Sequence, residues 1–529
     1  METGLKSLKI VTVIFGLLMV SCGESETDSE NATGTNQTTS VQPQGSSNSY
    51  TSSSASTETE CTVSFLVNGN IYYSVNVKKG EIIVPPQDPS IIGYKFLKWL
   101  NKDGTDWDKN APITNDNKTI IAQFEYDFLE IPAIIINTEN NQPITSKTDY
   151  VPSEISLKNA KAEWEFDNIP AGIRGRGNST WNLDKKPYRI KFEQKQSLFG
   201  SKKAKSWALI ANHSDKTLLR NYMAYELGER FDGIDFSSMH QPVDLYLNNE
   251  YCGVYLLCDQ IQTGKGRVNI DESISADGNN GYLIERDGHV AEDDTHILNK
   301  DYFVLDDLQY VIKTPDTDSE TYIENKDVQI NFIKNYFDTC FKAINNESWA
   351  TVESLIDVDS FVDSYFIEEL FAISDCGFSS CYFFKDKNGK LFKGPLWDFD
   401  TGAGNLNYNV GNAEQCLPNS SLYASYANVW YGALLKRDEF VNLLKTKLVS
   451  YRPILEEMFE MLEIDSETSL YKKYKNAFER NFLRWDIMGK FVWPQPNNVV
   501  SIATIKGQLG FMNSWLKSRY LYLRDIYLD

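Results

Sequence analysis

The chain has 529 residues, 41% of them hydrophobic, so its length and composition allow roughly two to four folded units. Its formal net charge is −21, from 73 acidic and 52 basic side chains. Because the phosphate backbone of a nucleic acid requires a basic surface, this charge argues against a nucleic-acid partner. It does not exclude a nucleotide-binding enzyme, since a basic patch can lie within an acidic surface. Most of the excess charge is explained by solubility.

Residues 1–22 are predicted to be an export signal. Lys6 and Lys9 precede an uncharged apolar run at 10–20, which is shorter than the ~20 residues that span a bilayer. The run ends in Met-Val-Ser-Cys-Gly, which resembles the lipobox of bacterial lipoproteins. That resemblance implies cleavage before Cys22, acylation of Cys22 and a lipid-anchored place in the cell envelope, at the outer membrane or the cell surface. The alternative is an ordinary signal peptide.

The remaining cysteines do not have the spacing of a metal or redox motif. No C-x-x-C pair occurs among them and the chain has only four histidines, so a zinc site built on cysteines is not expected. Their odd number leaves at least one free thiol, and we expect buried thiols with at most one disulfide. The seven are Cys61, Cys252, Cys258, Cys340, Cys376, Cys381 and Cys416.

Residues 23–60 are predicted to be a disordered tether. The segment consists mainly of Ser, Thr, Asn, Gln, Gly and acidic residues, so it cannot bury enough apolar surface to offset the entropy lost on ordering. It would hold the folded part of the chain away from the membrane.

Residues 61–126 are predicted to be a small β module. Apolar residues alternate at 63–67 and again at 73–77, which is the period-two pattern of half-buried strands, and Asn-Gly-Asn at 68–70 is a hairpin signal between them. Further strands are expected within 93–124. The whole segment resembles the internalin-type B-repeat, or Listeria–Bacteroides repeat, a β-grasp-like module of bacterial surface proteins. This resemblance implies a spacer or adhesive role without chemistry.

Residues 128–529 are predicted to be one large α+β domain. Strand-like runs come first and helical runs come later, which favours a sheet-rich lobe packed on a helical lobe. The pattern lacks strict βαβ alternation, so a doubly wound nucleotide-binding fold is disfavoured. The expected strands include 131–137, 188–192 and 243–247, and the expected helices include 327–345, 361–374, 434–461 and 505–527.

The most basic stretch of this acidic chain begins with the segment IRGRGNSTW at 173–181. Its glycines allow backbone N–H groups to approach a phosphate closely, and Arg174 and Arg176 supply forked donors. Lys191 lies on the strand that follows. The stretch therefore suggests an anionic ligand, with a tight turn and surface arginines as the alternative.

A second motif covers 207–221 and leads into a helix. Asp215 or Thr217 can cap this helix, which continues through Met223. Glu226 lies on it within reach of a neighbouring sheet, although a solvated surface charge is the simpler interpretation.

Acidic residues are predicted to converge at the open end of a hairpin. With Asn388-Gly389 as a two-residue loop, Asp398 lies opposite Ser379, only four residues beyond Asp375. Asp400 points the same way if the strand continues. Converging carboxylates repel each other unless a cation joins them or one is protonated, and Mg²⁺ takes carboxylates together with phosphate oxygens. The alternative is a surface hairpin with solvated acids.

Several ordered motifs between residue 128 and the C-terminus resemble those of the CotH family of spore-coat kinases and exported bacterial proteins. The resemblance implies a two-lobed, kinase-like fold that transfers the γ-phosphate of ATP, with Mg²⁺ or Mn²⁺, to Ser or Thr of a protein substrate. The matching segments are 135–139, 144–147, 174–181, 185–189, 207–221, 253–257, 281–285 and 394–400.

The same resemblance implies roles for particular residues. Asp398 of the Trp-Asp motif is placed as the metal ligand, and Asp375 as a base or second ligand. Phosphate contacts are expected from Arg174, Arg176 and Lys191. By analogy with kinases in general, Glu226 would pair with Lys191.

Two departures from the family pattern leave other functions open. Asp259 stands where many members have Glu, and Ser380 stands where some relatives have an Asn that binds a second metal. Both are compatible with a pseudokinase or a non-catalytic binding and adhesion lipoprotein. Asp398-x-Asp400 also fits the metal-bridged sugar-nucleotide motif of a glycosyltransferase.

Overall fold

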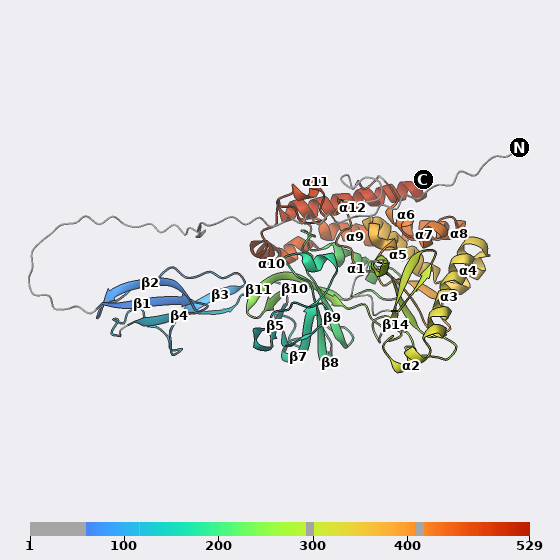
Figure 1. Ribbon diagram of the computed structural model, residues 1–529. Coiled ribbons are helices and arrows are strands. Elements are labelled where there is room, and N and C mark those ends of the chain that lie inside the picture. Colours follow the sequence, from blue (N-terminus) through green and yellow to red (C-terminus); the bar gives the residue numbers. More distant parts are fainter. Residues whose placement is uncertain (1–59, 116, 292–300, 408–416, 420, 529) are drawn as a thin grey trace, which may run out of the picture. The chain divides into compact units, whose positions relative to one another are not determined.

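The computed structural model describes residues 60–115, 117–291, 301–407, 417–419 and 421–528 (Figure 1). The predicted export signal, Cys22 and the tether up to residue 59 lie outside these residues, as does Cys416. Helices and sheets are both extensive, which confirms the α+β class. In the described ranges, no helix combines the length and the apolar character needed to cross a bilayer.

The N-terminal module is a four-stranded sheet in the order β2-β1-β4-β3, with β1 and β4 parallel. Asn68 and Gly69 both have positive φ angles, 49° and 79°, so they form the tight turn that the Asn-Gly pair predicted. Val63 and Phe65 are fully buried, as their alternation requires, and Phe65 meets Trp99 edge-to-face at 4.9 Å. The strands are β1 (Glu60–Val67), β2 (Asn70–Lys78), β3 (Tyr94–Asn101) and β4 (Lys118–Tyr126).

Seven strands that follow form a closed barrel in the order β10-β11-β9-β8-β7-β6-β5. The barrel closes through parallel pairing of β5 with β10, and its other pairs are antiparallel. Ile173 and Ile190 are fully buried in its interior and pair with each other, whereas Arg174 and Arg189 pair on the opposite face. The strands are β5 (Ala133–Thr138), β6 (Val151–Lys158), β7 (Phe166–Gly175), β8 (Tyr188–Gln196), β9 (Ala204–Ile210), β10 (His240–Leu247) and β11 (Glu250–Asp259).

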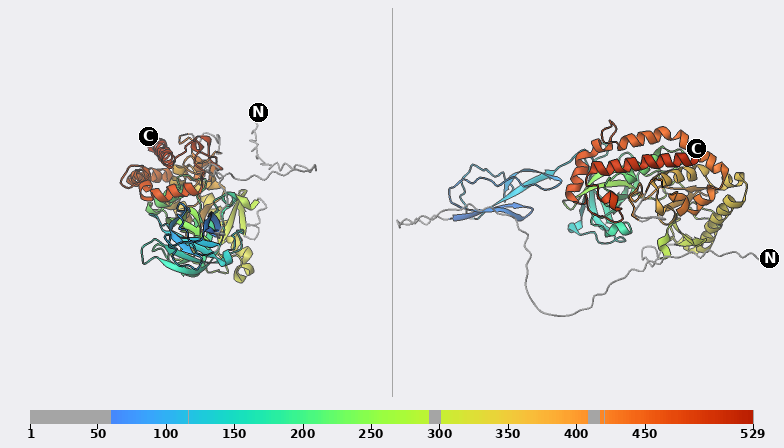
Figure 2. Two further views of the ribbon diagram at one scale, coloured as in Figure 1. Left: turned by 90° about the vertical axis from the view of Figure 1, so that its left-hand side faces the viewer. Right: turned by 90° about the horizontal axis from the view of Figure 1, so that it is seen from above.

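A five-stranded sheet, in the order β13-β14-β12-β15-β16, belongs to the helical part of the chain. Figure 1 shows the later helices grouped beside this sheet. Helix α12, the long helix at the red end of the chain in Figure 2, contacts α5, α8 and α9. No described sheet has doubly wound βαβ order, as the sequence indicated. The strands are β12 (Tyr282–Arg286), β13 (Tyr302–Leu305), β14 (Leu308–Thr314), β15 (Cys381–Lys385) and β16 (Leu391–Lys393).

The helices contribute to a large hydrophobic core that is separate from the interior of the barrel. Every residue of helix α5 except Asp359 is buried, so the helix has no face exposed to solvent. It ends at Phe371 because Ala372 adopts the left-handed conformation, three residues before the predicted end. The helices are α1 (Arg220–Arg230), α2 (Glu320–Glu324), α3 (Lys326–Asn346), α4 (Trp349–Leu355), α5 (Val358–Phe371), α6 (Tyr423–Ala427), α7 (Val429–Leu434), α8 (Asp438–Ser450), α9 (Arg452–Leu462), α10 (Leu470–Arg484), α11 (Asn497–Val500) and α12 (Ile505–Leu528).

Two local predictions are wrong. The single helix expected at 434–461 is divided into α8 and α9, because Pro453 has no N–H to continue the first helix and instead occupies the first turn of the second. The hairpin register is shifted by one residue, since Phe384 pairs with Phe392 and Lys385 with Leu391. The turn starts earlier than Asn388 because the Asp386 carbonyl accepts the N–H of Gly389 at 2.9 Å.

The six described cysteines are free thiols, and all but Cys252 are buried. The expectation of buried thiols is therefore confirmed for Cys61, Cys258, Cys340, Cys376 and Cys381.

A fully buried ion pair lies where the start of α1 meets a loop near residue 400. The guanidinium of Arg220 pairs with Asp215, and both side chains are 0% exposed. Arg220 Nε also donates to the carbonyl of Gly402 at 2.8 Å, and Nη2 donates to the carbonyl of Ala403 at 3.2 Å. The N-cap of α1 is Leu219, so neither Asp215 nor Thr217 occupies the predicted capping position. Asp215 Oδ2 nevertheless accepts the N–H of Arg220, the first residue of α1, at 2.9 Å.

Two asparagines tie the same segments together. Asn221 Oδ1 accepts the N–H of Phe399 at 2.7 Å, and Asn405 Nδ2 donates to the carbonyls of Asp400 at 2.8 Å and Ser214 at 3.1 Å. Residues 212–221 and 399–405 therefore form one hydrogen-bonded unit.

We predict that Asp215→Ala destabilises the protein by about 3–5 kcal/mol, because it leaves the buried Arg220 charge uncompensated. Urea unfolding followed by far-UV circular dichroism measures the change. Glu456→Ala removes the partner of Arg452 in a solvent-exposed pair on α9 and is the matched control, expected to unfold like the wild type. Similar unfolding curves for Asp215→Ala and Glu456→Ala would contradict a structural role for the buried pair.

Candidate active site

A cleft of about 380 Å³ lies between the barrel and the segment that follows β16. One wall comes from the β7–β8 connection and the end of β9, and the other comes from residues 397–400. The lining residues are Arg176, Thr180, Leu183, Lys185, Pro187, Ile210, Ala211, Asn212, His213, Trp397, Asp398 and Asp400.

Asp398 and Asp400 form the acidic wall of the cleft. Asp398 is exposed to solvent within the cleft, whereas Asp400 is only 7% exposed. Ser380 Oγ donates a hydrogen bond to Asp398 Oδ2 at 3.2 Å and so orients the carboxylate. The backbone of Asp398 is left-handed, with φ at 69°, a conformation that costs a residue with a Cβ roughly 1–2 kcal/mol. Such a conformation is found mostly where surrounding contacts or a functional geometry enforce it.

The pKa values of both carboxyls are raised. For Asp400, burial is the main cause of a pKa well above the usual range, and the negative charges of Asp398, Asp215 and Asp375 raise it further. For Asp398, the surrounding protein raises the pKa despite the exposure of the side chain, while Arg176 lowers it. Crowded carboxylates of this kind bind a proton or a cation to relieve their repulsion.

Asp375 lies at the edge of this acidic group. It belongs to the short 3₁₀ helix Ser374–Gly377, and its carbonyl accepts the N–H groups of Phe378 and Ser379 at 2.8 and 3.0 Å. Its side chain is half-buried, and its charge acts on Asp400. The structure therefore brings Asp375, Asp398 and Asp400 into one electrostatic group. It does so through the turns around Ser380 and Gly394, since β16 ends at Lys393 before the predicted ladder could reach Asp398.

Two cations belong to the cleft. The guanidinium of Arg176 lies 5.1 Å from the centre of the Trp397 ring. Lys185 is buried, and its Nζ donates to the carbonyl of Val254 and to Asn481 Oδ1, the latter at 2.9 Å. Burial lowers the pKa of Lys185 to about 7. An anionic ligand would favour its charged form.

His213 supplies a neutral polar group to the same cleft. Burial, followed by the nearby charge of Lys185, lowers the pKa of His213 to about 4, so the ring is uncharged at neutral pH. Its Nδ1 is buried and has no hydrogen-bond partner among the described residues. Buried polar atoms are normally satisfied, so this nitrogen is an exception within a residue that lines the cleft.

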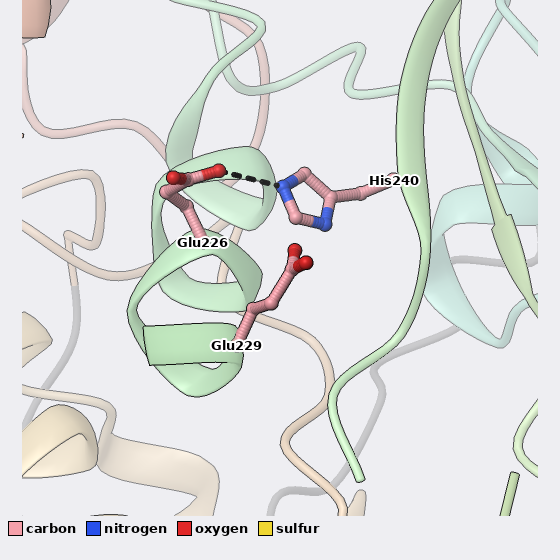
Figure 3. Close-up of side chains that lie close together, drawn as sticks. All are labelled: Glu226, Glu229 and His240. Atoms are coloured by element: carbon pink, nitrogen blue, oxygen red, sulfur yellow. Dashed lines mark hydrogen bonds and ion pairs between the residues drawn. The ribbon is translucent and has the colours of Figure 1, made fainter. Parts of the chain in front are cut away.

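Three of the residues predicted from sequence do not line the cleft. The guanidinium of Arg174 lies over the Tyr150 ring at 5.2 Å, and the exposed Lys191 lies over the same ring at 5.8 Å. Both occupy the outer face of the barrel because alternate residues of β7 and β8 point inward. Glu226 is bonded to His240 at 3.4 Å, and the expected pair with Lys191 does not occur among the ion pairs of the described residues (Figure 3).

Sequence reasoning missed Lys185 and His213 as cleft residues. Lys185 falls within the matching segment 185–189, and the available signal was its place three residues before β8 begins. His213 is one of only four histidines and stands where the buried strand β9 gives way to the polar segment before α1. Neither signal identifies a cleft without the fold.

The residues present fit a metal–nucleotide ligand. Asp398 and Asp400 offer carboxylate oxygens, which Mg²⁺ combines with phosphate oxygens. Arg176 and Lys185, which line the same cleft, offer positive charge to phosphates. Phosphotransferase sites combine the same kinds of group, because positioning and charge stabilisation carry that reaction.

Comparison with known families agrees with this class. The family model CotH kinase protein matches residues 173–523, and the Listeria-Bacteroides repeat domain model matches residues 62–123. The chain therefore belongs to the CotH kinase family, a family of protein kinase-like enzymes for which ATP and a divalent metal are the general cofactors. A search of curated proteins found none that matches.

We predict that Asp400→Asn stabilises the metal-free protein increasingly as the pH rises. A carboxyl whose folded-state pKa is raised is protonated at low pH without cost, and it destabilises the fold as the pH rises through that pKa. Thermal unfolding in EDTA at pH 5 and pH 8 measures the effect. Because the loss of stability begins near the unfolded-state pKa of about 3.9, we expect a small rise in the midpoint for Asp400→Asn at pH 5 and a larger one at pH 8.

Added Mg²⁺ supplies the complementary measurement. It should stabilise the wild type more at pH 8 than at pH 5, because protons compete with the cation, and it should have less effect on Asp400→Asn. A wild-type stability that rises between pH 5 and pH 8 in EDTA, equally in both proteins, would contradict the raised pKa.

Proposed function

We propose that this chain is an atypical protein Ser/Thr kinase that is held in the cell envelope by a lipid on Cys22. It would transfer the γ-phosphate of ATP to a Ser or Thr hydroxyl of a protein substrate. The observation that carries the proposal is a cleft with Asp398 and Asp400 on one wall and Arg176 and Lys185 on the others, with the charge of Asp375 acting on Asp400.

Each of these groups has a role suited to its environment. Asp398 and Asp400 would hold Mg²⁺ or Mn²⁺, whose charge offsets that of the phosphates, and Ser380 orients Asp398 for this task. Arg176 and Lys185 lie where they can contact phosphate oxygens. Asp375 would accept the proton of the attacking hydroxyl as the new P–O bond forms and the bond to the leaving ADP breaks.

The fold supports further parts of the proposal. The barrel and the helical part would be the two lobes of a kinase-like domain, because the cleft lies where they meet. The N-terminal sheet, with its parallel central pair, would be a β-grasp-like spacer between the anchor and the kinase. The protein substrate would then be found at the outer membrane or cell surface.

A non-catalytic binding or adhesion protein is the second candidate function. Ser380 favours it, because Ser is a weaker ligand for a second metal ion than the Asn found in some relatives, and here it is bonded to Asp398. Calorimetry with Mg²⁺–ATP separates the two functions. Absence of binding at millimolar nucleotide would favour adhesion.

We predict that Asp398→Asn lowers phosphate transfer by about 10²-fold or more, because it removes a charge that holds the metal. Transfer from radiolabelled ATP to envelope proteins or to the chain itself measures the activity. Asparagine tolerates the left-handed backbone of this position, so the fold should survive, as near-UV circular dichroism would verify. Asp338→Asn, on α3 and away from the cleft, is the matched control and should retain activity. Equal activity of Asp398→Asn and Asp338→Asn would rule out the proposed kinase site.

A second pair of variants tests which lysine serves the nucleotide. Lys185→Met should raise the KM for ATP by about tenfold or more, the loss expected for a hydrogen bond to a charged group. Lys191→Met should change the KM less than about twofold, since a solvated surface charge contributes little. The reverse order would return the nucleotide contact to Lys191, as the sequence alone suggested.

A further inference from the structure

We propose that Glu226, Glu229 and His240 form a second metal site, separate from the cleft, that binds a divalent transition metal such as Zn²⁺. The two glutamates lie three residues apart on α1, so they share one face of the helix, and His240 begins β10. One ligand atom from each residue lies within 4.8 Å of the other two. Figure 3 shows the side chains of Glu226 and Glu229 extending from the helix toward the imidazole of His240.

The hydrogen bonding of His240 is the strongest argument for a cation. Its Nδ1 lies 2.9 Å from the carbonyl oxygen of Ser238, and a carbonyl only accepts, so Nδ1 carries the proton. In the neutral ring, Nε2 then presents a lone pair to Glu226 Oε2 at 3.4 Å. A lone pair and a carboxylate repel unless a proton or a metal ion lies between them. A histidine whose other nitrogen donates to a backbone carbonyl is the usual arrangement of a metal ligand.

The imidazole is also held in place. Its side chain is only 5% exposed, and the rings of Tyr222 and Tyr225 contact it edge-to-face, with centroids 4.7 and 6.0 Å away. Nε2 is therefore fixed toward the carboxylates before any ligand arrives. A ligand that is already oriented loses little entropy on binding.

The carboxylates differ in a way that suits metal entry. The side chain of Glu226 is 24% exposed, so it is partly shielded from water. The guanidinium of Arg230, on the same helix, is paired with Glu457. Glu229 is exposed, which leaves one side of the group open to water and to an incoming ion.

The donor set determines the class of metal. One imidazole nitrogen with two carboxylate oxygens suits Zn²⁺ and related transition metals, whereas Mg²⁺ prefers oxygen donors alone. In a tetrahedral site, two ligands that are each ~2.1 Å from zinc lie ~3.4 Å apart, so the exposed side chain of Glu229 has to move toward the other two ligands to complete the site. Water would occupy the fourth position.

The site is connected to the cleft through aromatic rings. Tyr225 contacts His240 on one side and stacks on Trp397 on the other, with centroids 6.0 Å apart and planes inclined by 18°. Trp397 directly precedes Asp398. A metal ion that fixes α1 against β10 would therefore also restrain the wall of the cleft, whether or not the cleft performs catalysis.

Metal titration of the EDTA-treated protein tests the proposal. Calorimetry should show one Zn²⁺ per chain that 1 mM Mg²⁺ does not displace, and Co²⁺ should give visible absorption bands of a nitrogen–oxygen site. Glu229→Gln should weaken Zn²⁺ binding by about tenfold or more, and His240→Gln should remove the Co²⁺ bands. Glu456→Gln, an exposed glutamate of α9, is the matched control and should bind like the wild type.

Several outcomes would overturn the proposal. One is the absence of Zn²⁺ binding at 100 μM, which would mean that a proton alone joins His240 to Glu226. Another is Zn²⁺ binding that Glu229→Gln leaves unchanged; because this residue is exposed, its variant should fold even if His240→Gln does not. Thiolate charge-transfer bands with Co²⁺ would assign the metal to cysteines instead.

Discussion

The arrangement of the cleft depends on the buried ion pair between Arg220 and Asp215. Both side chains are inaccessible to solvent, and Arg220 also bonds the carbonyls of Gly402 and Ala403. Removing two charges from water is expensive, and the cost is offset only when geometry and additional hydrogen bonds are favourable. The pair therefore specifies one position for the 399–405 loop relative to α1. Asp400 belongs to this loop and Asp398 directly precedes it. Their place in the cleft therefore follows from a contact between Arg220 and Gly402, which are 182 residues apart in sequence.

In the acidic group beside this pair, the cost of burying charge is not offset by a counter-charge. Asp215 is paired with Arg220, whereas Asp400 is buried near Asp375 and Asp398, and the charge of Arg220 offsets only a small part of their repulsion. Protein folding alone gives no reason to crowd three carboxylates in this way. The left-handed backbone at Asp398 adds a second local cost. Unfavourable local terms that the surrounding structure enforces are a feature of functional sites, and here they coincide with the family motif.

The sequence predicted those features that depend on local pattern. The strands around Val63 and Phe65 and the helices α3 and α12 follow from periodicity. The hairpin register could not be predicted, because the Asp386 carbonyl competes with Asn388-Gly389 for the turn. The sequence alone could not show that Lys185, and not Lys191, lines the cleft, because Lys185 is held in place by Asn481, 296 residues later. Glu226 was assigned to the wrong partner because His240 belongs to a strand whose position is set by the closed barrel.

The hydrogen bonds of Lys185 have a consequence for the order in which the protein matures. This lysine is secured by the carbonyl of Val254 on β11 and by Asn481 on α10. Synthesis proceeds from the N-terminus, so every barrel strand leaves the ribosome well before α10 exists. During that interval the ammonium group lacks one of its two acceptors. The newly made barrel therefore cannot present a finished cleft, and a chain that stops short of α10 would carry the complete acidic motif without a correctly seated lysine.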